Sequence, residues 1–208
     1  MNKTACRGLY AITDAVLLPD ERLLAAVEQA ILGGARSVQY RDKSGDGGRR
    51  LAQAHGLNRL CRRHQVPLIV NDDVELAAQV GAAGVHIGRN DPAFATARAR
   101  LGEAALIGVS CYDCLALALD AERAGADYVA FGAFFPSPTK PDEIRAPLGL
   151  LREAKVSLKV PVVAIGGITP DHAPTLLDAG ADALAVVSAL FAQPDIRDAA
   201  RRFAALFT

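Results

Sequence analysis

The feature that most constrains this chain is a regular alternation of short apolar runs with longer amphipathic segments. The apolar runs are rich in β-branched residues and predict strands buried on both faces, as in a parallel sheet. Eight runs have this character, at residues 9–13, 37–40, 67–70, 84–87, 105–109, 127–131, 160–165 and 183–187. Amphipathic segments that favour helix lie between them, including residues 20–32, 48–64, 74–80, 113–124 and 170–179.

Strand and helix repeated eight times in 208 residues predict a single-domain (β/α)8 TIM barrel over residues 1–208. A Gly-Ala pair recurs between a helix and the next strand, where a left-handed glycine can end the helix, at Gly34, Gly81, Gly125 and Gly180. The main alternative is an open doubly wound sheet, which usually has a glycine-rich first strand-to-helix turn. Residues 13–17 contain no glycine, so the closed barrel is favoured.

Composition narrows the range of partners. The chain carries 23 Lys and Arg against 23 Asp and Glu, a balance that disfavours binding to nucleic acid or to an anionic membrane. No apolar run reaches the ~18 residues of a membrane span, and the N-terminal residues do not resemble a signal peptide. We therefore expect a cytoplasmic protein with four free thiols and small-molecule substrates, and a homo-oligomer is compatible with the sequence.

Polar side chains follow most of the predicted strands. In a TIM barrel the C-terminal strand ends form one rim, and the chemistry of the fold takes place there. The polar segments begin at Gln39, Asn71, His86, Ser110, Gly132, Gly166 and Val187. Together they predict a polar, charged mouth on an apolar barrel.

Gly166-Gly167 and Val187-Ser188 predict a phosphate site. The loops after the seventh and eighth strands of such barrels commonly offer backbone N–H groups to a phosphate, and glycine lets the backbone approach it closely. The structural alternative is a turn followed by a helix cap.

Cations and carboxylates are expected at the same rim. Arg41, Lys43 and Lys140 imply an anionic ligand, most simply a phosphate or pyrophosphate, unless they are solvated surface charges. Asp72 and Asp91 end neighbouring strands, about 5 Å apart, where they could share a Mg²⁺ ion. The alternative is that both aspartates belong to helix caps.

Three further features are given structural roles. Asp73 is expected to cap the helix that follows it. His86 is expected to be a hydrogen-bonded structural histidine rather than a base. The paired arginines on the helices, Arg49-Arg50 among them, are expected to face solvent.

Eight short motifs occur in order along the chain: Tyr10-x-Ile12-Thr13-Asp14, Gln39-x-Arg41-x-Lys43, Asn71-Asp72, Gly84-Val85-His86-x-Gly88-x-x-Asp91, Gly108-x-Ser110, Ser137-x-Thr139-Lys140, Gly166-Gly167-Ile168 and Val187-Ser188. In combination they resemble the thiamine phosphate synthase family, and the resemblance covers nearly the whole chain. The pattern departs from the family at Arg89, where members often have glutamine, and at Ala133, where a proline frequently follows the glycine.

The resemblance implies a transferase that joins 4-amino-5-hydroxymethyl-2-methylpyrimidine diphosphate to a thiazole phosphate and releases pyrophosphate. It implies dissociative chemistry, in which a pyrimidinylmethyl cation is captured by the thiazole nitrogen. The implied Mg²⁺ ligands are Asp72 and Asp91. The implied pyrimidine diphosphate ligands are Gln39, Tyr40, Arg41, Asp42, Lys43, Asn71, Ser110 and Lys140, of which Arg41, Lys43, Ser110 and Lys140 would be catalytic. The implied thiazole phosphate ligands are Ser137, Pro138, Thr139, Gly167, Val187 and Ser188.

Two other functions fit parts of the pattern. The thiazole tautomerases share the fold but lack much of the diphosphate and metal set, which this chain retains. A non-catalytic phosphate sensor would need the phosphate loops without the aspartate pair. Mg²⁺ dependence of diphosphate binding therefore separates such a sensor from a synthase.

Overall fold

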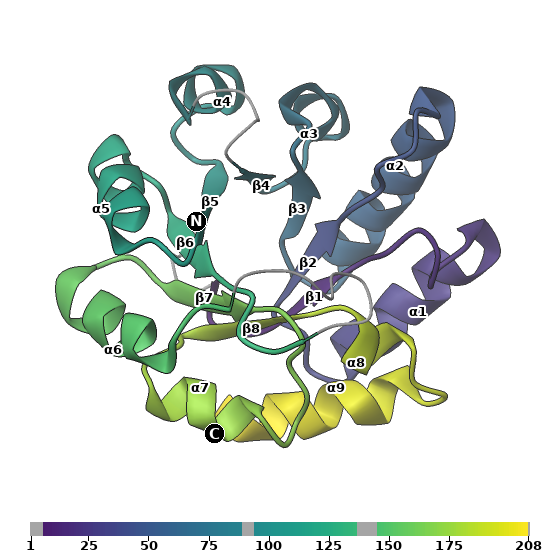
Figure 1. Cartoon of the computed structure of the whole chain (residues 1–208). Helices are drawn as coiled ribbons and strands as arrows, with labels where there is room; N and C mark the ends of the chain where they lie inside the picture. Colours follow the sequence, from purple (N-terminus) through teal and green to yellow (C-terminus); the bar gives the residue numbers. More distant parts are fainter. Residues whose placement is uncertain (1–5, 89–93, 137–144, 208) are drawn as a thin grey trace.

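The strands form one closed parallel barrel, in which each strand pairs with the next along the chain and β8 returns to β1. The computed structural model describes residues 6–88, 94–136 and 145–207. Figure 1 shows the strands in the centre of the molecule with the helices around them, so the predicted TIM barrel is confirmed. The strands are β1 (Gly8–Ile12), β2 (Ser37–Tyr40), β3 (Leu68–Asn71), β4 (Gly84–Ile87), β5 (Leu106–Tyr112), β6 (Tyr128–Phe131), β7 (Val162–Ile165) and β8 (Ala183–Val186).

The helices of the described chain match most of the predicted segments. They are α1 (Asp20–Leu32), α2 (Gly47–Arg63), α3 (Val74–Val80), α4 (Phe94–Leu101), α5 (Leu115–Ala124), α6 (Leu148–Ser157), α7 (Ala173–Asp178), α8 (Ser188–Phe191) and α9 (Ile196–Ala204), with a 3-10 turn, η2 (Ala205–Phe207), after α9. Helix α7 is shorter than the predicted 170–179 because residues 170–172 form a turn ahead of it. None of these helices is long and apolar enough to cross a membrane.

Apolar side chains form one cluster inside the barrel and a larger one between the strands and the helices. Successive strand residues point to opposite faces, and the inner cluster includes Tyr10, Ile69, Leu106, Tyr128 and Val163. The outer cluster packs the other strand face against the helices. Both strand faces are therefore buried, which is why the strands read as continuous apolar runs in the sequence.

Strand β5 ends at Tyr112 rather than at the predicted residue 109. The carbonyl of Tyr112 accepts a hydrogen bond of 2.9 Å from the N–H of Gly132, and Tyr112 pairs with Phe131 after a register shift beyond Ser110. Ser110 therefore lies within the strand, paired with Ala130 of β6, rather than after the strand end.

The four glycines of the Gly-Ala repeat are left-handed, as predicted. Their φ angles are 111° at Gly34, 64° at Gly81, 97° at Gly125 and 111° at Gly180. A residue with a β-carbon is disfavoured at such angles. These glycines therefore let the chain turn sharply from each helix into the next strand.

Two of the repeats are followed by aspartates that tie neighbouring strands together. Oδ2 of Asp127 accepts hydrogen bonds from the N–H of Ile107 at 2.9 Å and from Nη2 of Arg98 at 2.7 Å. Asp182 makes the equivalent contact with the N–H of Val162 at 3.0 Å. The sequence repeat thus corresponds to a repeated contact at the N-terminal end of the barrel.

Replacing Asp127 by alanine should lower the free energy of unfolding by about 2 kcal/mol, because the Ile107 N–H loses its acceptor and the Arg98 guanidinium loses its carboxylate partner. Urea unfolding followed by circular dichroism measures the change. Asp120→Ala is the matched control, since Asp120 contacts only Arg123 on an exposed helix face in the described chain, and should cost about 0.5 kcal/mol or less. Equal losses in the two variants would contradict this role for Asp127.

Candidate functional site

The predicted site residues from separate strands share the C-terminal rim of the barrel. Asn71 of β3 lies opposite His86 of β4, and Ile165 of β7 lies opposite Ala185 of β8. The segments that follow these strands therefore leave the barrel side by side. The predicted residues at this rim, or just beneath it, are Gln39, Tyr40, Arg41, Asp42, Lys43, Asn71, Asp72, Ser110, Gly167, Val187 and Ser188.

Five predicted site residues lie outside the described residues. They are one proposed metal ligand and four residues of the segment after β6, namely Asp91, Ser137, Pro138, Thr139 and Lys140. Arg89, the departure from the family pattern, lies outside them as well. Their roles stay predictions.

Arg41 and Lys43 extend from the loop after β2. The backbone N–H of Arg41 donates to Oγ1 of Thr13 at 2.9 Å, and its guanidinium lies 3.7 Å from the carboxylate of Asp14. Nζ of Lys43 lies 3.6 Å from Oδ2 of Asp72. Thr13 and Asp14 belong to one of the family motifs but had no predicted role, and they position Arg41.

Asp42 is buried and holds the same loop from below. Its side chain is 2% exposed, and Oδ2 accepts a hydrogen bond of 2.8 Å from Nη2 of Arg49. Oδ1 accepts another, of 2.7 Å, from the N–H of Ser44. Burial alone would raise the pKa of Asp42, but these hydrogen bonds and the neighbouring arginines outweigh it and lower the pKa.

The prediction that Arg49 and Arg50 face solvent is wrong. Arg49 binds Asp42, and Nη2 of Arg50 lies 2.8 Å from Oδ2 of Asp73. The helix cap predicted at Asp73 is confirmed, because its Oδ1 accepts a hydrogen bond of 2.9 Å from the N–H of Leu76. Helical spacing alone does not show that the first turn of α2 lies under the loops after β2 and β3.

Asp72 suits one position of a Mg²⁺ site. It has a left-handed φ of 63°, its N–H donates to the carbonyl of His86 at 2.8 Å, and its side chain is 35% exposed. A carboxylate at an open rim is the hard oxygen ligand that Mg²⁺ prefers. Within residues 6–88, 94–136 and 145–207 no three His, Cys, Asp or Glu side chains cluster as a metal site, and the second proposed ligand, Asp91, lies outside these residues.

A continuous chain of hydrogen bonds crosses the barrel interior beneath the rim. Nε2 of Gln39 donates to the hydroxyl of Tyr10 at 2.8 Å, and that hydroxyl lies 2.9 Å from the hydroxyl of Tyr128. The Tyr128 hydroxyl lies 3.1 Å from Nδ1 of His86, whose Nε2 lies 2.8 Å from Oγ of Ser110. We call these five residues the interior chain. His86 is hydrogen-bonded on both ring nitrogens, as predicted for a structural histidine.

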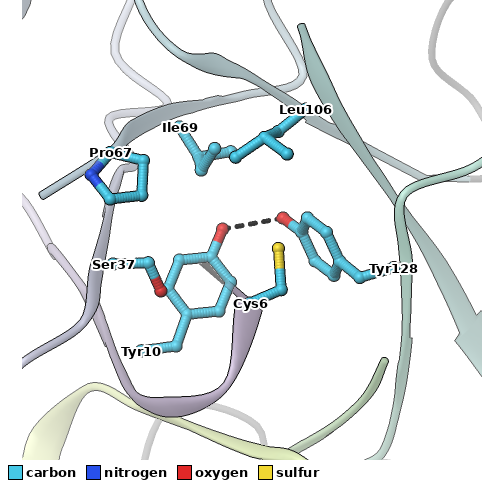
Figure 2. A pocket seen from close by; sticks show the side chains of 7 residues that line it. All are labelled: Cys6, Tyr10, Ser37, Pro67, Ile69, Leu106 and Tyr128. Atoms are coloured by element: carbon cyan, nitrogen blue, oxygen red, sulfur yellow. Dashed lines mark hydrogen bonds between the residues drawn. The ribbon is translucent and has the colours of Figure 1, made fainter. Parts of the chain in front are cut away.

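Tyr10 and Tyr128 were not among the predicted functional residues, although the sequence holds a signal for them. Both occupy inward-facing positions of apolar strands, where a polar group needs a partner. Burial raises the pKa of both tyrosines well above the usual value. Burial therefore favours the protonated form of both hydroxyls, which Figure 2 shows joined by a hydrogen bond.

Gly167 is required by packing between two loops of the rim. It has a φ of 63°, and a β-carbon there would lie 2.4 Å from the carbonyl oxygen of Pro136 and 2.6 Å from that of Phe135. The loop after β7 therefore lies directly against the backbone that follows β6. On the other side, α8 begins at Ser188, and Val187, its N-cap, is the single residue between it and β8.

Comparisons with known proteins agree with this architecture. A family model described as thiamine monophosphate synthase matches residues 9–190. The thiamine-phosphate synthase of Thiobacillus denitrificans is 58% identical over 201 residues, covering 96% of this chain and 94% of that protein. The enzyme of the same name from Nitrosococcus oceani is 54% identical over 200 residues, covering 96% and 92%. The solved thiamine phosphate pyrophosphorylase of Pyrococcus furiosus superposes with a TM-score of 0.90 at 35% identity, covering 99% of this chain and 98% of that one.

Replacing Arg49 by glutamine should lower the free energy of unfolding by about 2 kcal/mol, because the buried carboxylate of Asp42 loses its charged partner. Chemical denaturation measures the loss. Arg201→Gln, on the exposed face of α9, is the matched control and should change stability by about 0.5 kcal/mol or less. If Arg49→Gln also loses only about 0.5 kcal/mol or less, the ion pair with Asp42 contributes little and Arg49 behaves as a solvent-facing residue.

The stabilisation from Asp42 should depend on pH. Because the pKa of Asp42 is lowered in the folded state, its contribution is present above the unfolded value of about 4 and is lost as the pH falls through the lower folded value. The stability difference between the wild type and Asp42→Asn should therefore shrink as the pH is lowered below about 4. Urea unfolding at a series of pH values measures it, and a difference that is constant with pH would contradict the assignment.

Proposed function

The chain belongs to the thiamine monophosphate synthase family of transferases, and on that premise we propose how its own residues carry out the reaction. It is an enzyme of thiamine biosynthesis that makes thiamine phosphate. The proposed substrates are 4-amino-5-hydroxymethyl-2-methylpyrimidine diphosphate and 4-methyl-5-(2-phosphoethyl)thiazole, the latter with or without a carboxyl group. The products are thiamine phosphate and pyrophosphate.

The observation that carries the proposal is the convergence of charge at one rim. Arg41 is fixed by Thr13 and Asp14, and Lys43 lies against Asp72, which follows the next strand. Two cations beside a carboxylate suit a ligand that is itself anionic and binds with a divalent metal. A diphosphate bound to Mg²⁺ has this charge distribution.

We assign the rim to two substrates. The pyrimidine diphosphate would bind Gln39, Asn71 and Ser110 through its ring and Arg41, Lys43 and Lys140 through its phosphates, with Tyr40 and Asp42 shaping the β2 side of the site. The thiazole phosphate would bind Ser137, Pro138, Thr139, Gly167, Val187 and Ser188. Holding both substrates in one mouth removes the entropic cost of a bimolecular encounter.

The proposed mechanism is dissociative. The bond between the pyrimidine methylene carbon and the diphosphate oxygen breaks, and both electrons leave with pyrophosphate. The thiazole nitrogen then donates its lone pair to the resulting pyrimidinylmethyl cation. The protein supplies no nucleophile, and the main task of Arg41 and Lys43 is to stabilise charge that gathers on the leaving oxygens.

Asp72 and Asp91 are the proposed Mg²⁺ ligands. The ion, when bound, would neutralise the departing pyrophosphate and orient it. Lys43 lies 3.6 Å from Asp72 and partly neutralises its charge. Lys43 is largely exposed, which leaves it free to turn toward a phosphate oxygen.

We also assign the protein to the cytoplasm, with no nucleic acid or membrane partner and with a homo-oligomer compatible with the sequence. The reducing conditions of that compartment suit its free thiols. Of the four cysteines, Cys6, Cys61 and Cys111 are buried, and burial raises the pKa of each of these three thiols to about 12.

A coupled assay with both substrates and Mg²⁺, repeated with each of the three omitted, tests the proposal. Formation of thiamine phosphate should require all three. Diphosphate binding that is indifferent to Mg²⁺, without turnover, would favour a phosphate sensor instead. Turnover with metal chelated would overturn the metal assignment.

Asp72→Asn should lower kcat by about 10²–10³-fold, since the leaving group loses part of its preorganised charge stabilisation. The fold should be retained because the Asp72 side chain lies at the open rim. Steady-state kinetics over a range of Mg²⁺ concentrations measures the effect. Asp113→Asn, an exposed carboxylate in the loop after β5, is the matched control and should leave kcat unchanged. Wild-type turnover of Asp72→Asn at limiting Mg²⁺ would refute the role.

A further inference from the structure

An aromatic stack joins the segment after β6 to the turn that precedes α7. The rings of Phe135 and His172 lie with their centroids 4.1 Å apart and their planes at 19°. Phe135 is partly buried and His172 is exposed, so the histidine ring lies on the outer side of the pair. Neither residue has a role in the proposed function, and the contact joins two segments that leave neighbouring strands.

The backbone on the His172 side of this stack is fixed. Ile168 and Ala173, on either side of the turn, are both buried. Between them, the carbonyl of Thr169 accepts hydrogen bonds from the N–H of His172 at 3.1 Å and from the N–H of Ala173 at 3.0 Å. The His172 side chain makes no capping hydrogen bond to α7. The helix therefore does not require a histidine at this position, and what the ring provides is the contact with Phe135.

On the other side of the stack, the segment after β6 lies along the segment after β7. The N–H of Phe134 donates to the carbonyl of Ile165 at 3.2 Å, and the N–H of Phe135 donates to the carbonyl of Gly166 at 3.1 Å. The carbonyl oxygen of Phe135 lies 2.6 Å from the place that a β-carbon of Gly167 would occupy. The stack adds a side-chain contact beside these backbone contacts.

Both segments belong to the thiazole phosphate side of the proposed site. Gly167 is one proposed ligand. The proposed ligands Ser137, Pro138 and Thr139, which lie outside the described residues, begin two positions after Phe135 in the sequence. A phosphate bound by two loops needs them at a fixed spacing, because hydrogen bonds to its oxygens require donor–acceptor distances of about 2.7–3.2 Å. A contact between the two segments next to these ligands affects that spacing.

We propose that His172 is a positioning residue for the thiazole phosphate. By stacking on Phe135 it holds the segment after β6 against the segment after β7, and so keeps the two loops at the spacing that the phosphate requires. The histidine acts neither as an acid or base nor as a ligand in this role, because its contact is with an aromatic ring. The inference rests on the proposed function, since the thiazole phosphate must lie between these two loops.

Steady-state kinetics with each substrate varied in turn tests the proposal. His172→Ala should raise the KM for the thiazole phosphate by about 3- to 10-fold, the size expected for the loss of one aromatic pair. The kcat and the KM for the pyrimidine diphosphate should stay within about 2-fold of the wild-type values, because only binding at the thiazole side is weakened. His172→Phe keeps an aromatic ring at this position and should restore the wild-type KM.

Two further sets of variants separate the stack from a general effect on stability. His55→Ala is the matched control, because His55 is an exposed histidine of α2, which Figure 1 shows on a different side of the barrel from α7. All its kinetic constants should equal those of the wild type. Phe135→Leu should raise the same KM as His172→Ala, and the double variant should show no further rise, because the stack is already lost.

The stack itself has a test that needs no activity. In ¹H NMR spectra, the ring current of Phe135 should shift the carbon-bound ring protons of His172 upfield. These signals should return toward the usual positions in Phe135→Leu. The protein has only four histidines, so the signals that disappear in His172→Ala identify this ring.

Several results would overturn the inference and leave the proposed function standing. They are an unchanged KM for the thiazole phosphate in His172→Ala, an equal rise in His55→Ala, a KM that His172→Phe does not restore, additive effects in the double variant, and His172 signals that do not respond to Phe135→Leu. A wild-type protein that makes no thiamine phosphate would refute the proposed function, and the inference would fall with it.

Discussion

A polar side chain inside the barrel must find a hydrogen-bond partner there, and this constraint organises the structure. An unpaired hydroxyl or amide in the apolar interior costs about 1–3 kcal/mol, so the polar groups of β1, β2, β4, β5 and β6 satisfy one another in a single line. The line must end where a partner can be supplied from outside. It ends at Gln39 and Ser110, at the two sides of the mouth.

The charged side chains of the loops after β2 and β3 fall into two groups. Asp42 and Asp73 are bound by arginines from the first turn of α2, so these carboxylates fix the loops after β2 and β3 rather than face the ligand. Arg41, Lys43 and Asp72 lie on the same loops but point their charges to the open rim. In each loop, therefore, one aspartate fixes the backbone by binding an arginine of α2. The charged residue next to it faces the open rim.

The two systems suit the two halves of the proposed substrate. The rim charges match a diphosphate and its metal, where binding is dominated by electrostatics and tolerates motion of long side chains. The interior chain ends at Gln39 and Ser110, the residues that the proposed function assigns to the pyrimidine ring. The charged side chains and the buried hydrogen bonds thus lie in different layers of the same barrel.

The sequence by itself determined the barrel, because strands buried on both faces leave an apolar signal that does not depend on distant contacts. It also placed Arg41, Lys43 and Asp72 at the rim, since each follows a strand end directly. Only the tertiary structure decided that Arg49 and Arg50 bind loop aspartates, that Ser110 lies within β5, and that Tyr10 meets Tyr128 across the interior. Tyr10 and Tyr128 are 118 residues apart, and Arg50 and Asp73 are 23 apart. Arg49 and Asp42 are only seven apart, but they belong to a helix and to the loop before it. Such side-chain contacts are set by how the helices and loops pack on the barrel rather than by local pattern.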